Sequence, residues 1–212
     1  MTPQRFIGFV LAAQWVLTCI LKFIEGQPVE LAWLCHVTLL LAAMGLILNR
    51  PLLIHAALIA VLGPHSLWLM DLTGSVILGY SPFGITGYLE GMPWWVWLGT
   101  AHHLYLMPIL LWIVLRSDDP PRGAIWLASV LYLYLTVFSH AFLPATDNVN
   151  YAHGLFGAID FGLLNNLNRL PGAPYLLLLN VGTTAVFFAP AGWLILKVRR
   201  RLNTPSASSH AV

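Results

Sequence analysis

Six stretches of mostly apolar residues, separated by short polar breaks, constrain this chain more than any other feature of the sequence. They cover roughly residues 6–24, 31–48, 52–72, 94–115, 124–143 and 175–198. A helix needs about 20 such residues to cross the hydrocarbon of a bilayer. The breaks contain proline, as in Asn49-Arg50-Pro51, and proline ends helices. The pattern predicts an all-α, polytopic integral membrane protein with a six-helix transmembrane bundle, forming a single domain over residues 1–203.

The composition supports this fold class and excludes others. Charged residues make up only 8% of the chain and hydrophobic residues 58%. A soluble domain carries about 25% charged residues, so this chain cannot cover a globular surface with charge. The same figures exclude a disordered chain and a nucleic-acid-binding protein. Two cysteines exclude a cysteine-rich metal cluster or a disulfide scaffold.

The distribution of lysine and arginine predicts how the bundle is oriented. With six spans, one side holds eight of these residues and the other holds two, Lys22 and Arg169. The eight are Arg5, Arg50, Arg116, Arg122, Lys197, Arg199, Arg200 and Arg201. Positive residues favour the cytoplasmic side. We therefore expect both termini in the cytoplasm, in a bacterial inner membrane, with outer loops at 73–93 and 144–174 and a disordered tail at 204–212.

This orientation places most of the polar side chains of the spans in the outer half of the membrane. At 1.5 Å per residue, Cys35 and His36 lie roughly 6–8 Å below the outer boundary, and His102 and His103 about 12 Å below it. Three further residues belong to the outer third of their spans: His65, Asp71 and His140. Ionisable groups at such depth usually face the bundle interior. We expect a site that opens to the outer leaflet; the alternative is that these histidines only donate to carbonyl groups of neighbouring helices.

One chemistry open to this group is nucleophilic catalysis through Cys35. A thiolate forms most easily beside an imidazole. Neighbouring residues on a helix point about 100° apart, so His36 is a poor partner for Cys35, and only one of His102 and His103 should face it. His103 is then the expected base, with Asp71 orienting its ring. The alternative for Cys35 is a small buried hydrophobic residue.

Two other chemistries remain open. A metal ion or haem could take three or four ligands from His36, His65, His103 and His140, which lie on different helices, together with Asp71. A disulfide between Cys19 and Cys35 is also conceivable, since both lie near the same short outer turn, and it would remove the nucleophile.

Short motifs distributed along the chain resemble those of the YwaF-type six-span bacterial membrane proteins. The motifs are Trp33-Leu34-Cys35-His36, Ala101-His102-His103-Leu104-Tyr105, Asn150-Tyr151 and Leu170-Pro171-Gly172-Ala173-Pro174-Tyr175. That family is distantly related to a eukaryotic transmembrane acyltransferase that works through a cysteine. The number of spans, the chain length and the order of the motifs agree, so the resemblance covers most of the chain.

The resemblance implies acyl transfer in the outer leaflet without a cofactor. Cys35 would attack a membrane phospholipid ester, His103 would act as base and then acid, with His36 and His102 in support, and Asn150 or Tyr151 would stabilise the oxyanion. The partner is a phospholipid, not a nucleic acid. Two alternatives stand beside this expectation: a metal- or haem-binding membrane redox component, and a non-enzymatic subunit of a membrane complex.

Overall fold

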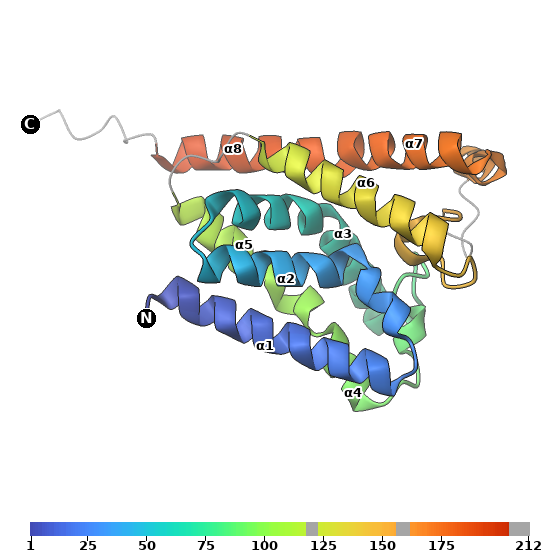
Figure 1. Ribbon diagram of the computed structural model, residues 1–212, viewed down its shortest axis with the longest axis horizontal. Helices are drawn as coiled ribbons and strands as arrows, with labels where there is room; N and C mark the ends of the chain where they lie inside the picture. Colours follow the sequence, from blue (N-terminus) through green and yellow to red (C-terminus); the bar gives the residue numbers. More distant parts are fainter. Residues whose placement is uncertain (118–122, 156–161, 204–212) are drawn as a thin grey trace, which may run out of the picture.

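The computed structural model describes residues 1–117, 123–155 and 162–203, and all regular structure in this part of the chain is helical (Figure 1). The longer helices are α1 (Pro3–Ile24), α2 (Leu34–Ile47), α3 (Pro51–Leu78), α5 (His102–Arg116), α6 (Ala124–Phe142), α7 (Gly172–Thr183) and α8 (Ala189–Asn203). The short ones are α4 (Trp94–Thr100), the 3-10 turns η1 (Pro28–Ala32), η2 (Gly87–Leu89), η3 (Val149–Tyr151) and η4 (Gly162–Arg169), and the π-helical turn η5 (Thr184–Phe188). The expected tail at 204–212 lies outside the described residues.

Five helical segments in the described residues are long and apolar enough to cross a membrane. They are Pro3–Ile24, Pro51–Leu78, Trp94–Arg116, Ala124–Phe142 and Gly172–Leu202. The all-helical character is confirmed, and these segments suggest a multi-pass membrane protein. The stretch expected at 31–48 differs, because its first residues form η1 and the α-helix begins only at Leu34. Its 14 residues in α2 span about 21 Å, less than the about 30 Å of hydrocarbon.

Two helices differ from the expected boundaries for local reasons. α3 does not end near residue 72 but continues to Leu78, where Gly79 adopts the left-handed conformation (φ 77°) that ends many helices. Within α3, Gly74 allows close packing, since a Cβ atom there would lie 2.5 Å from the Pro82 ring. The stretch expected at 94–115 is interrupted at Ala101, which separates α4 from α5.

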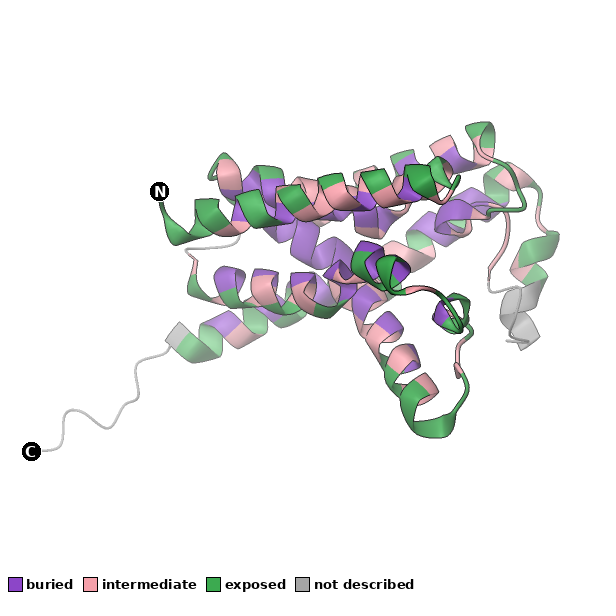
Figure 2. Cartoon of the chain, turned by 90° about the horizontal axis from the view of Figure 1, so that it is seen from below, coloured by how far each residue is buried: buried purple, intermediate pink, exposed green. Residues whose placement is uncertain are grey.

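Small residues bring the first three helices into close contact. A Cβ atom on Gly8 of α1 would lie 2.9 Å from the side chains of Leu46 and Ile47 in α2. Gly45 of α2 stands equally close to Ile54 of α3. Small residues at helix interfaces allow such approach and are typical of membrane bundles. Figure 2 shows the result: buried residues concentrate where helices face one another, and exposed residues cover the outer faces.

Helices α7 and α8, joined by η5, run as one nearly straight element beside α6 (Figure 1). The N-terminus of α1 and the last described turn of α8 lie at the same end of the bundle (Figure 1). The polar side chains of the candidate site come mainly from the other half, where α2 and α5 begin.

Candidate functional site

Four histidine rings from three helices form a continuous group in the middle of the bundle. His36 comes from α2, His65 from α3, and His102 and His103 from α5. The ring centroids of His36 and His102 are 5.2 Å apart, those of His102 and His103 are 4.2 Å apart, and those of His65 and His103 are 4.6 Å apart. All four side chains are buried. We call these four residues the histidine cluster.

Backbone carbonyl groups orient three of the four rings. The Nδ1 atom of His36 lies 2.7 Å from the carbonyl oxygen of Glu30, and that of His103 lies 2.9 Å from the oxygen of Thr100. His102 makes the same contact with Gly99 at 3.3 Å. A carbonyl oxygen only accepts hydrogen bonds, so each Nδ1 carries the proton. Each Nε2 atom therefore carries the lone pair, which can accept a hydrogen bond or bind a metal ion.

Several nitrogens of the cluster have no hydrogen-bond partner within the described residues. They are the Nε2 atoms of His36 and His102 and both ring nitrogens of His65. His65 is only 1% exposed, so water does not solvate it from the surface. A buried polar atom without a partner costs about 1–3 kcal/mol. The histidine cluster concentrates four such atoms, and unpartnered ring nitrogens are the kind of ligand atom that a metal ion binds.

The potential ligand atoms fall into two sets of three. In one set they belong to Cys35, His36 and His102, and all lie within 4.8 Å of one another. In the other they belong to His65, His102 and His103, with the same spacing. Imidazole nitrogen and thiolate sulfur are ligands of zinc and copper in proteins. His102 belongs to both sets.

His102 and His103 both face the cluster, although adjacent helical residues were expected to point in different directions. Each Nδ1 bonds a carbonyl three residues earlier in the chain, in the last turn of α4. This bond draws both rings back toward the break at Ala101 rather than outward from α5. The break between α4 and α5 therefore places two neighbouring imidazoles on the same side.

Cys35 has different partners from the one expected. We predicted His103 as the base beside this thiol, and the structure instead groups Cys35 with His36 and His102. The ring of His36 turns back toward η1 through its bond to Glu30, which brings it close to the preceding residue. His103 lies on the other side, stacked on Trp68 with ring centroids 4.7 Å apart.

Asp71 does not orient a histidine; it holds the loop that follows α3. Its carboxylate accepts hydrogen bonds from the Ser81 hydroxyl at 2.5 Å and the Phe83 amide at 2.5 Å. The amide and hydroxyl of Thr86 donate to the same group, both at 2.7 Å. The loop between α3 and α4 thus folds over this buried carboxylate. Trp68, one turn earlier in α3, supports His103, so Asp71 affects the cluster only through the local fold.

Asn150 and Tyr151 anchor the beginning of α2. The side-chain oxygen of Asn150 accepts a hydrogen bond from the Leu34 amide at 2.7 Å, and its amide group donates to the Ala32 carbonyl at 2.8 Å. Tyr151 packs edge-on against Trp33, with ring centroids 5.5 Å apart. Burial raises the pKa of the Tyr151 phenol to about 12, so it stays protonated at neutral pH. The side-chain amide of Asn150 is thus hydrogen-bonded to the backbone just before Cys35. Through these bonds it positions the Cys35 thiol.

His140 lies apart from the cluster. Its Nδ1 bonds the Ala152 carbonyl at 3.0 Å, and its ring stacks on His153 with centroids 4.7 Å apart. Of the ligands expected for a metal ion, His36, His65 and His103 come together, whereas Asp71 and His140 do not. The structure adds Cys35 and His102, which we had assigned to other roles.

A partly buried ion group beside the cluster escaped the sequence analysis. The Lys22 ammonium lies 2.7 Å from carboxylate oxygens of both Glu25 and Glu30, and Lys22 is only 4% exposed. Glu30 also supplies the carbonyl that orients His36. The sequence does contain one lysine and two glutamates around a short turn. It does not show that they are in contact, because that contact depends on how η1 folds.

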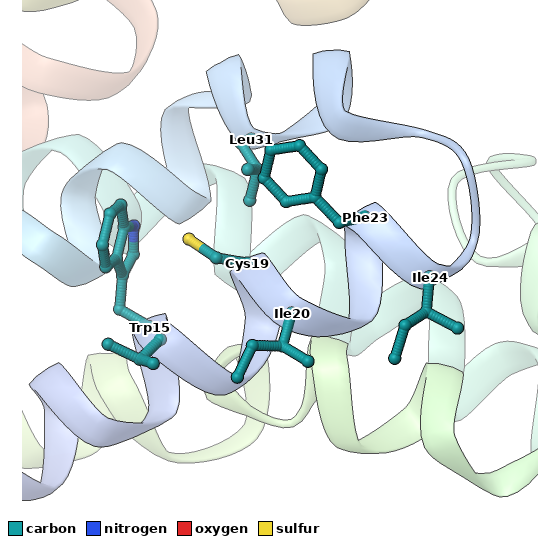
Figure 3. A pocket seen from close by; sticks show the side chains of 7 residues that line it. Trp15, Cys19, Ile20, Phe23, Ile24 and Leu31 are labelled. Carbon is teal, nitrogen blue, oxygen red and sulfur yellow. The ribbon is translucent and has the colours of Figure 1, made fainter.

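The two cysteines are both free thiols, so the structure contains no Cys19–Cys35 disulfide. Cys19 instead lines a shallow groove of about 650 Å³ on the outside of α1 (Figure 3). The groove is formed by Trp15, Val16, Cys19, Ile20, Phe23, Ile24 and Leu31. Its lining is entirely apolar, as expected for a surface that faces acyl chains.

No protein-family model matches the chain, and no curated protein or solved structure matches it significantly. The resemblance to the YwaF-type proteins therefore stays a prediction from short motifs. The functional proposals below rest on the residues of this chain.

Proposed function

We propose that this protein is a multi-pass membrane protein that binds a transition-metal ion in its histidine cluster, as the metal-holding component of a membrane complex. The observation that carries this proposal is the set of buried, unpartnered ring nitrogens on His36, His65 and His102, because His36 and His65 each belong to a set of three ligand atoms that also includes His102. A metal ion satisfies several acceptors at once, which no single hydrogen-bond donor does. This proposal takes up the metal-binding alternative and replaces Asp71 and His140 with Cys35 and His102.

The surroundings of the cluster are typical of a metal site. Metal-ligating histidines usually donate the proton of their other nitrogen to a carbonyl or carboxylate, which fixes the ring and its tautomer. His36, His102 and His103 each have such a carbonyl partner. His55 and His140 also have a carbonyl partner, so the feature that distinguishes the cluster is the spacing of its ligand atoms, within 4.8 Å of one another in sets of three.

We propose that the chain crosses the membrane six times, with both termini in the cytoplasm. The lysine and arginine bias supports this orientation, and an even number of crossings agrees with the two ends of the described chain lying together (Figure 1). His36, His65 and His103 lie 11, 14 and 13 residues from Ile47, Pro51 and Arg116, the helix ends on that side. At 1.5 Å per residue these separations are about 17–21 Å, so the three rings share one depth.

Metal content tests the proposed function directly. The full chain is purified in detergent, exposed separately to copper(I) and zinc, freed of excess ion and analysed for metal per chain. We expect about one ion per wild-type chain and almost none in His102→Gln, because His102 belongs to both ligand sets. The matched control is His140→Gln, which changes a histidine outside the cluster and should keep its ion. Equal metal content in all three proteins contradicts the proposal.

A second candidate function is acyl transfer through Cys35, favoured by the position of this thiol within 4.8 Å of a ring nitrogen of His102. His102 Nε2 would take the thiol proton as sulfur attacks a phospholipid ester carbonyl. The same nitrogen would return the proton to the departing lyso-lipid hydroxyl, leaving an acyl thioester on Cys35. An acceptor hydroxyl would then take the acyl group and restore the thiol. His102 replaces His103 as the base in this scheme.

A labelled phospholipid separates the two candidates. If acyl transfer operates, the wild-type chain acquires hydroxylamine-sensitive label, Cys35→Ala does not, and Cys19→Ala labels normally. If metal binding is the function, no thioester forms and a bound ion protects the thiol. Label that persists in Cys35→Ala rejects the acyl-transfer candidate.

A further inference from the structure

We infer that the ion is copper(I), held by Cys35, His36 and His102, and that His65 and His103 form a second ligand set that shares His102, so that the chain holds one ion and not two. This inference rests on the proposed metal-binding function. It adds the identity of the ion, the participation of the thiolate and the number of ions per chain.

The softness and the number of the ligands together favour copper(I) over zinc, although catalytic zinc sites also use three protein ligands and a water. Each set offers three ligand atoms, one from each residue. Structural zinc sites are almost always four-coordinate and tetrahedral. Soft thiolate ligands favour copper(I), and a cysteine with two histidines is a recurrent trigonal copper set. The set that contains Cys35 therefore fits copper(I) better than zinc.

The charge of the complex also favours copper(I). When the ion binds, the S–H bond of Cys35 breaks, the S–Cu bond forms and the proton leaves to solvent. A copper(I) ion and one thiolate then sum to zero charge, whereas zinc and one thiolate sum to +1. An uncompensated charge inside a bundle is costly. The neighbouring group of Lys22, Glu25 and Glu30 has a net charge of −1 and offsets part of this cost, although Glu30 is 32% exposed and shares its charge with solvent.

The shared ligand limits the chain to one ion. Nδ1 of His102 donates to the Gly99 carbonyl, which leaves only Nε2 for a metal. One lone pair binds one ion, so the two sets cannot be filled independently. Neither ring nitrogen of His65 has a hydrogen bond among the described residues, so whichever nitrogen lacks the proton can complete the second set when Cys35 is absent.

A competition titration against a chromophoric copper(I) chelator, without oxygen, tests this arrangement in the detergent-purified full chain. Wild type should bind one ion. His102→Gln should lose more than about 100-fold in affinity, since outer-shell partners alone contribute 10–100-fold. Cys35→Ser should lose less, because the ion moves to the His65 set, and Cys35→Ser combined with His65→Gln should match His102→Gln. Cys19→Ser and His140→Gln are matched controls and should bind as wild type.

A second measurement needs no change in the cluster. In the Cys19→Ser protein, Cys35 is the remaining thiol, and copper(I) should block its alkylation by a maleimide whereas zinc at the same concentration should block it less. Two ions per chain, unchanged affinity in Cys35→Ser, or alkylation that proceeds in the presence of copper(I) each overturns the inference. If one of these results is found but copper(I) or zinc still binds in a His102-dependent way, the proposed metal-binding function stands and only the copper(I) inference is wrong. If neither copper(I) nor zinc binds, both the proposed function and this inference are wrong.

Discussion

The imidazole rings of His102 and His103 lie 4.2 Å apart, centroid to centroid, although the two residues are neighbours at the start of α5. Both rings are held by carbonyl groups of α4, and His102 connects two ligand sets from three helices. A single ion held by Cys35, His36 and His102 would tie α2 to α5, while α3 supplies His65 to the second set. The predictions below follow from that connection and from the residues that support it.

Metal binding should stabilise the folded protein. An ion that binds only the native state adds about 2.7 kcal/mol to the free energy of unfolding at 100 times its dissociation constant. We expect copper(I) to raise the thermal unfolding midpoint of wild type and a chelator to reverse this. His102→Gln should show no such rise, and His140→Gln should behave as wild type. A copper-induced rise of equal size in His102→Gln would show that the ion binds elsewhere.

His65→Leu should make the metal-free protein more stable. The substitution removes two buried nitrogens that lack partners and replaces the ring with an apolar group of similar size. Relief of one unpartnered polar atom contributes about 1–3 kcal/mol. The measurement is thermal unfolding of the metal-free protein in detergent, followed by circular dichroism. In His55→Leu the lost ring already had a bond to the Pro51 carbonyl at 2.8 Å, so we expect a smaller gain or a loss. A metal-free His65→Leu protein that unfolds earlier than wild type contradicts this prediction.

Asp71→Asn should loosen the loop between α3 and α4. The carboxylate accepts four hydrogen bonds from Ser81, Phe83 and Thr86, and an amide offers one acceptor oxygen in place of two. Hydrogen bonds to a charged group contribute about 1.5–3 kcal/mol each, so the substitution removes much of the free energy that holds this loop in place. Limited proteolysis should cut residues 79–93 several times faster than in wild type. Glu90→Gln changes an exposed acid of the same loop and should leave the cleavage rate unchanged. Equal cleavage of Asp71→Asn and wild type would show that the carboxylate does not hold the loop.

Asn150→Ala should displace the start of α2 and weaken metal binding. Asn150 has a positive φ of 57° and bonds both Leu34 and Ala32, so alanine loses the hydrogen bonds and adds backbone strain. The strain of a left-handed alanine is about 1–2 kcal/mol. Asn150→Gly removes the same bonds without strain and should be less destabilised than Asn150→Ala by about that amount. Thermal unfolding separates the two contributions, and copper(I) affinity should fall in both variants. An Asn150→Gly protein as stable as wild type would show that the bonds to the start of α2 contribute nothing.

The amino-acid sequence by itself determined that this chain is helical and suited to a membrane. Apolar stretches of sufficient length and breaks at proline and glycine are local properties, and burial of apolar side chains in lipid depends little on which helices meet. The same reasoning placed Cys35, His36, His65, His102 and His103 in the outer half of the membrane, because depth follows from position along a span. The prediction of helix boundaries failed at α2, where a short 3-10 turn and the contact with Asn150 make the α-helix begin only at Leu34.

Only the tertiary structure decided which of these residues share a site. Side-chain direction depends on the break between α4 and α5 and on carbonyl groups three to six residues away, and hydrophobic periodicity contains neither. The structure therefore moved His102 to the centre of the site and assigned Asp71 to a loop and Asn150 to the start of α2. Depth is set by the number of residues from a helix end, whereas ligation requires three side chains from two helices to point at one place, and that is fixed by how the helices pack.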